Sequence, residues 1–153
     1  YLNWAVPSNI LKPMLPGWEA ALSLVYDSQA YRRNVSTGTE QIREYTPRHL
    51  RLGAVLAHSD GLGLNLTFTR VNAAGIYFEV TDEAYIPMSL PFSDQFWMVD
   101  AALSYRLPGR IGEVVFGAMN LTNHRGFKYL EMDPLNPRFA PQRFVYGKVV
   151  IKF

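Results

Sequence analysis

The feature that most constrains this 153-residue chain is the recurrence of apolar residues at every second position. The clearest case runs from Leu62 to Thr69, where aliphatic or aromatic residues alternate with small or polar ones. Successive side chains of a β-strand point to opposite faces, so this pattern predicts a strand with one apolar and one polar face. The segments predicted to be strands are residues 18–27, 48–58, 62–72, 96–107, 112–121 and 144–153. The fifth is apolar on both faces, which leaves its orientation open. The opening residues are predicted to hold part of a further strand.

Short and long connections alternate between these segments. Pro16-Gly17, Asp60-Gly61 and Pro108-Gly109 predict tight turns, because Pro fixes φ and Gly accepts positive φ at no steric cost. Between these turns lie three polar segments, predicted as loops of roughly twenty residues. Such loops count against a compact soluble domain. Outer-membrane barrels instead have short periplasmic turns and longer extracellular loops.

Aromatic residues stand near both ends of several apolar stripes. Trp18 and Tyr26 bracket the first stripe, as in lipid-facing strands whose aromatic girdles lie at the membrane interfaces. The last segment carries Val149, Ile151 and Phe153 on its apolar face. It resembles the terminal strand of bacterial outer-membrane proteins, which the barrel-assembly machinery is thought to read. The fold class predicted is all-β, an antiparallel up-and-down transmembrane β-barrel segment in contact with outer-membrane lipid.

The composition excludes several other classes of protein. No run of about 18 apolar residues occurs, which excludes a helical membrane span. The formal charge is +2 and the basic residues are scattered, so no nucleic-acid partner is expected. The chain has no Cys, which excludes disulfides and thiolate metal sites. Single-chain barrels begin at about eight strands, so we expect residues 1–153 to be the C-terminal part of a larger barrel domain.

Two segments near the C-terminus carry a family resemblance. Residues 99–105 (VDAALSY) and 116–123 (FGAMNLTN) resemble the end of a TonB-dependent outer-membrane receptor. In that family the penultimate strand finishes in an Asn-Leu pair, followed by an aromatic residue and then Asp or Asn. Asn120, Leu121 and Asn123 fit, whereas Thr122 replaces the aromatic. The resemblance implies a barrel of about 22 strands that imports a scarce nutrient, such as a metal-siderophore complex. Energy coupling would run to TonB through a plug domain, but neither a plug nor a coupling box is visible in this sequence.

Two groups of polar residues are candidates for binding. One group is predicted to face the lumen, as a solvated wall or as the surface of a polar passage or plug contact: Glu19, Asp27, Arg51, Asp100, Ser104 and Arg106. The other group is predicted to lie in the first long loop, as solvated charge or as contacts to an anionic ligand or to lipopolysaccharide phosphates: Arg32, Arg33, Arg43 and Arg48. Aromatic residues predicted near the outer rim are Tyr77, Phe78, Tyr85 and Trp97, as girdle or ligand-stacking groups.

The sequence predicts no catalytic, cofactor or metal site. His58-Ser59-Asp60 has the residue types of a nucleophilic triad but falls at a predicted hairpin, where Ser and Asp favour turns. The leading hypothesis is a non-enzymatic receptor and transporter segment in the bacterial outer membrane, for an unidentified small ligand. The alternatives are a barrel that serves as an anchor or export conduit fused to periplasmic domains, and a soluble antiparallel β-protein.

Overall fold

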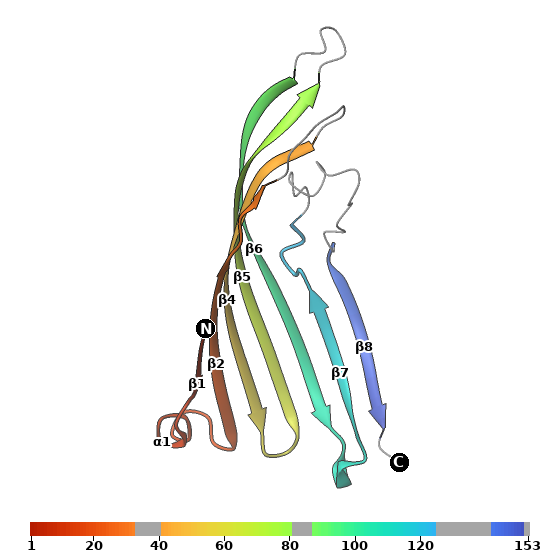
Figure 1. Ribbon diagram of the computed structural model, residues 1–153. Coiled ribbons are helices and arrows are strands. Elements are labelled where there is room, and N and C mark those ends of the chain that lie inside the picture. The colour runs from red at the N-terminus through yellow and green to blue at the C-terminus, as the bar shows by residue number, and fades with distance from the viewer. Residues whose placement is uncertain (33–40, 81–86, 125–141, 152–153) are drawn as a thin grey trace.

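The computed structural model describes residues 1–32, 41–80, 87–124 and 142–151. All of its strands belong to one antiparallel sheet, and seven of them follow the order β1-β2-β4-β5-β6-β7-β8, while β3 pairs with β4 off this path. The elements are β1 (Leu2–Ala5), α1 (Ser8–Leu11), β2 (Trp18–Ser28), β3 (Tyr31–Arg32), β4 (Gln41–His58), β5 (Leu62–Val80), β6 (Pro87–Arg106), the 3-10 helix η1 (Pro108–Arg110), β7 (Gly112–Met119) and β8 (Phe144–Ile151). Figure 1 shows them side by side. The prediction of an all-β, antiparallel, up-and-down sheet is confirmed.

The three predicted turn sites all lie at one end of the sheet, which we call the turn end (Figure 1). Only the connection at Gly61 is tight, because residues 6–17 with α1 connect β1 to β2 and residues 107–111 with η1 connect β6 to β7. Each site contains a glycine with positive φ: 82° at Gly17, 96° at Gly61 and 71° at Gly109. In the second turn the Gly61 N–H donates to the carbonyl oxygen of His58 at 3.0 Å. A side chain at such a φ would be strained, which accounts for glycine at these three positions.

Where the structure describes them, two of the predicted long loops are largely strand, so their predicted extent was wrong. β4 begins at Gln41. β5 pairs with β6 along its whole length, from Leu62 opposite Tyr105 to Val80 opposite Pro87. The third loop agrees with the structure at residues 122–124 and 142–143, which lie outside the strands, and the rest of it lies outside the described residues. The sheet therefore extends well beyond the apolar stripes, to what we call its far end.

The prolines of β6 explain part of this error. Pro87 and Pro91 lie in β6, which pairs with β7 only from Ala101 to Arg106. Before Ala101, β6 therefore has a strand neighbour on one side only among the described residues. Proline has no N–H to donate, and edge segments of this kind tolerate it.

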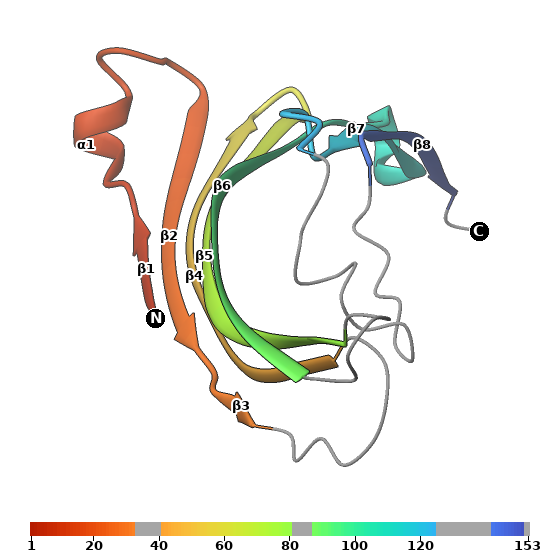
Figure 2. The same cartoon turned by 90° about the horizontal axis from the view of Figure 1, so that it is seen from above.

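The sheet is curved, with β4, β5 and β6 forming the middle of the curve (Figure 2). The buried apolar side chains share one face in the cross-strand register and lie towards the far end: Val71, Ala73, Phe92 and Phe96. A curved sheet shields the side chains on its concave side, so their burial identifies this face as the concave one. Alternate residues on the same strands then lie on the convex face.

The register also fixes the orientation of β7, which the sequence leaves open. Val114 lies between Tyr105 of β6 and Val149 of β8, and Phe116 lies between Leu103 and Gly147. Paired residues of an antiparallel ladder point to the same face. Val114 and Phe116 are therefore on the convex face.

Candidate functional site

The convex face carries an apolar surface that continues from strand to strand. One row of paired residues runs through Leu22, Ala54 and Leu66 to Ala101. We call this surface the outer band, and its members are Leu2, Trp4, Ala20, Leu22, Leu24, Leu50, Leu52, Ala54, Leu56, Leu62, Leu64, Leu66, Phe68, Val99, Ala101, Leu103, Val114, Phe116, Ala118, Val145, Gly147, Val149 and Ile151.

Large side chains of the outer band are open to the surroundings. Phe116 is 62% and Val149 64% exposed. Soluble monomers rarely expose contiguous apolar patches of more than a few hundred Å², and each Å² left in water costs roughly 25 cal/mol. An apolar surface that crosses seven strands is therefore expected to be covered by an apolar partner.

Aromatic residues border the outer band at two heights. Trp18 and Tyr105 lie towards the turn end, and Tyr26 and Trp97 lie towards the far end. Trp18 and Tyr26 are separated by eight positions, or about 26 Å along the strand. With the usual tilt of barrel strands this corresponds to about 20 Å along a membrane normal, comparable with the band of roughly 25 Å in outer-membrane barrels.

Beyond the far aromatic row, the polarity of the two faces is reversed. On the convex face Arg48 and Gln95 are exposed, whereas on the concave face Val71 is 1% and Phe96 6% exposed. The same strands thus carry apolar residues outside near the turn end and inside near the far end. The outer band is therefore a bounded feature of the convex face and not a general property of the sheet.

The concave face carries the polar residues predicted to point away from the apolar stripes. The register places all six of them on this face: Glu19, Asp27, Arg51, Asp100, Ser104 and Arg106. Nδ1 of His49 lies 2.8 Å from Oδ2 of Asp27, across β2 and β4. The prediction that these residues share one face is confirmed.

Comparisons of the chain with protein-family models, with curated proteins and with solved structures give no match. The function must therefore be argued from the arrangement of the residues.

The Asn-Leu pair occupies a built turn at the end of β7, which we call the Asn120 turn (residues 120–124). Asn120 has φ 49° and Asn123 has φ 50°, in the left-handed region that Asn tolerates better than most residues. The Asn120 side chain is 1% exposed. Its Oδ1 accepts from Thr122 Oγ1 at 3.0 Å and from the His124 N–H at 3.2 Å, and its Nδ2 donates to the His124 carbonyl at 3.2 Å.

The Asn120 turn is tied to both neighbouring strands. The N–H of Asn120 donates to Asp100 Oδ1 at 2.7 Å, and the N–H of Leu121 donates to the Val99 carbonyl at 2.7 Å. From the other side Arg143 donates through its guanidinium to the Leu121 carbonyl at 2.8 Å. The N–H of Arg143 also donates to Asn123 Oδ1 at 3.3 Å. These contacts give Asn120, Leu121 and Asn123 a structural role, because they join β6 and β7 to the residue that precedes β8.

The other predicted binding residues are dispersed. Arg32 forms an ion pair with Glu44 at 3.2 Å. Arg33 lies outside the described residues, and Arg43 lies in β4. Arg48 is also in β4, exposed on the convex face, in agreement with the predicted strand 48–58. Assigning Arg43 and Arg48 to the first long loop was wrong. The structure does not bring these arginines together as one described cluster.

The structure describes most, but not all, of the residues predicted for the terminal signature and the outer rim. Val149 and Ile151 lie on the convex face of β8, 64% and 57% exposed, and Phe153 lies outside the described residues. Of the rim aromatics, Tyr77 and Phe78 lie in β5, Trp97 lies in β6, and Tyr85 falls outside the described residues.

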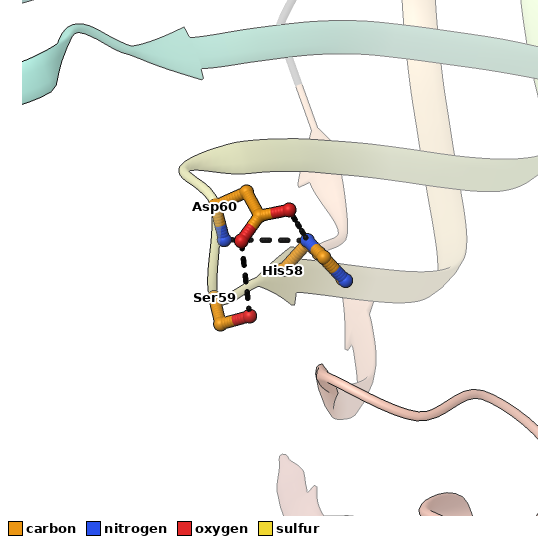
Figure 3. A network of polar contacts seen from close by, with 3 residues as sticks. All are labelled: His58, Ser59 and Asp60. Atoms are coloured by element: carbon orange, nitrogen blue, oxygen red, sulfur yellow. Dashed lines mark hydrogen bonds and ion pairs between the residues drawn. The ribbon is translucent and has the colours of Figure 1, made fainter.

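The His58-Ser59-Asp60 segment has the geometry of a turn (Figure 3). Nδ1 of His58 accepts from the Asp60 N–H at 3.2 Å and lies 3.4 Å from Asp60 Oδ2. The Ser59 hydroxyl donates to Asp60 Oδ1 at 3.5 Å. A nucleophilic serine would instead be hydrogen-bonded to the histidine. These contacts stabilise the hairpin.

Metal-ligand clusters and membrane-spanning helices are both absent from the described part of the chain. No group of three or more His, Cys, Asp or Glu residues there could hold a metal ion. None of its helices is both long enough and apolar enough to span a membrane.

Sequence reasoning missed Arg70. It occupies the convex position directly after Phe68 and lies in register with Leu50 and Trp97. The signal was present, because continuing the alternation Leu62, Leu64, Leu66, Phe68 by two residues reaches Arg70. It is the first charged residue on the convex face of β5.

Proposed function

We propose that this sheet is a section of the wall of a transmembrane β-barrel in the bacterial outer membrane, with the outer band against lipid and the concave face towards the lumen. The observation that carries the proposal is the outer band itself. Its side chains are exposed or half-buried, none of them is charged, and aromatic residues border it at both edges. In a bilayer this apolar surface would contact acyl chains, whereas its exposure to water raises the free energy of the folded protein.

The two edges of the sheet support the same proposal. Among the described strands β1 and β8 each have one neighbour. In hydrocarbon each unpaired backbone group costs several kcal/mol, so spanning sheets close into barrels. Further strands that pair with β1 and β8 would complete the wall. Val149, Ile151 and Phe153 would present the terminal strand to the barrel-assembly machinery.

The resemblance around the Asn120 turn extends the proposal to a TonB-dependent receptor. Such a protein would take up a scarce nutrient, for example a metal-siderophore complex, by binding and conformational release without bond chemistry. Coupling to TonB would require a plug domain in addition to this sheet. A barrel used as an anchor or export conduit shares the outer band but needs no plug. Saturable binding of a ferric siderophore by the intact protein would favour the receptor.

Labelling of adjacent positions on β5 tests the membrane orientation. The chain has no cysteine, so Leu66→Cys and Thr67→Cys each introduce a single thiol, on the convex and concave face respectively. In lipid vesicles we expect a water-soluble maleimide to label Thr67→Cys at least tenfold faster than Leu66→Cys, because the thiol at position 66 faces hydrocarbon. Both variants should react at similar rates after unfolding in denaturant. Equal rates in the vesicles would overturn the proposal.

A further inference from the structure

Two arginines lie on the convex face immediately beyond the far aromatic row. Arg48 pairs with Asn72, which pairs with Gln95, and Arg70 lies in the adjoining row beside Trp97. We call Arg48, Arg70, Asn72 and Gln95 the convex basic patch. Arg48 and Arg70 are diagonal neighbours on β4 and β5, a relation that separates side chains by about 7–8 Å. A group with several acceptor oxygens can contact both.

The Arg70 side chain is held by neutral partners. Its guanidinium donates to Gln95 Oε1 at 3.3 Å and lies 5.5 Å from the centroid of the Trp97 ring. No carboxylate of the described residues lies within ion-pair distance of Arg48 or Arg70. Arg32 differs in this respect, because Glu44 neutralises it at 3.2 Å. The patch therefore presents two positive charges without a counter-charge from the described sheet.

The position of the convex basic patch defines its partner. Tyr26 and Trp97 mark the edge of the outer band, and membrane aromatics of this kind sit at headgroup level. Arg48 and Arg70 lie at or just beyond that level, next to a surface that would contact acyl chains. Arginine binds phosphate oxygens through charge-assisted, often bidentate, hydrogen bonds.

We propose that the convex basic patch binds the phosphate headgroup of an anionic lipid in the leaflet at the far edge of the outer band. The lipid's acyl chains lie along the outer band while its phosphate bridges Arg48 and Arg70, with Asn72 and Gln95 as neutral hydrogen-bonding groups beside it. This inference rests on the proposed membrane orientation and adds to it a specific lipid site.

The test is a titration of the intact protein in neutral detergent with phosphatidic acid, with bound lipid counted by native mass spectrometry. We expect the double variant Arg48→Gln/Arg70→Gln to bind the first lipid roughly 25-fold more weakly, about fivefold for each cation near the membrane surface. The matched control is Arg51→Gln/Arg106→Gln, which removes the same charge from the concave face. It should bind phosphatidic acid within about twofold of the unmodified protein, because these arginines do not face lipid. Phosphatidylcholine should bind both variants equally.

Two results would overturn the lipid site. One is an equal loss of affinity in the two double variants, which would mean that net charge alone attracts the lipid. The other is full competition by millimolar inorganic phosphate, which would identify a general anion site. Thiol labelling of the double variant at position 66 separates this inference from the proposed function. If Leu66→Cys stays protected while lipid affinity is unchanged, only the lipid site fails, whereas rapid labelling contradicts the membrane orientation itself.

Discussion

Replacing Ala54 by arginine is expected to destabilise the membrane-inserted protein by about 2–4 kcal/mol, the cost of a cation on the lipid face near the bilayer midplane. Ala54 is in the middle row of the outer band, between Leu22 and Leu66 in the register. An arginine there can reach water only by extending past one of the aromatic rows. The measurement is the free energy of unfolding in urea with the protein in lipid vesicles.

The control for this substitution lies three residues away on the same strand. Ala57 is exposed on the concave face and is paired with Glu19. Ala57→Arg places the same side chain in water, opposite a carboxylate, and should change stability by less than about 0.5 kcal/mol. If Ala54→Arg were as mild as Ala57→Arg, the convex face would not be in contact with lipid.

Replacing Asn120 by alanine is expected to have an effect of comparable size, a loss of about 2–5 kcal/mol. The buried Asn120 side chain satisfies both the N–H and the carbonyl of His124, and removing a buried hydrogen-bonding partner costs about 1–3 kcal/mol. A further cost of about 1–2 kcal/mol arises because alanine is strained at positive φ. Unfolding in denaturant measures the sum.

The variant Asn120→Gly separates the two contributions. Glycine adopts φ 49° without strain but makes none of the side-chain hydrogen bonds. We expect it to recover about 1 kcal/mol relative to the alanine variant. A loss below about 0.5 kcal/mol in both variants would show that the Asn120 turn does not hold β7 in place.

The sequence predicts the sheet well where apolar and polar residues alternate along a whole segment. Around Leu66 the two-residue period gives the strand, its face and the turn at Gly61, and the structure agrees on all three. It fails beyond the far aromatic row, because the apolar residues there change face while the strands continue. Val71 and Phe96 are apolar but lie on the concave face. The apolar stripe on the convex face therefore ends while the strands continue.

The site is less accessible to sequence reasoning than the sheet. The predicted strand 112–121 includes the Asn-Leu pair, whereas β7 ends at Met119 and the pair lies in the Asn120 turn. The contacts of this turn to Asp100 and Arg143 join residues about twenty positions apart, which no local pattern predicts. The convex basic patch escapes sequence reasoning because Arg48 and Arg70 meet only through the cross-strand register.

The depth of the three tryptophans in a bilayer tests the central claim most directly. Trp4 pairs with Leu22 in the middle row of the outer band, whereas Trp18 and Trp97 lie in its two aromatic rows. Variants that retain one tryptophan, with the other two changed to phenylalanine, are placed in vesicles of lipids brominated at shallow or deep acyl positions. We expect deep bromines to quench Trp4 most strongly and shallow bromines to quench Trp18 and Trp97 most strongly. Tryptophan fluorescence that no brominated lipid quenches, in a chain that is folded, would contradict a membrane-spanning sheet.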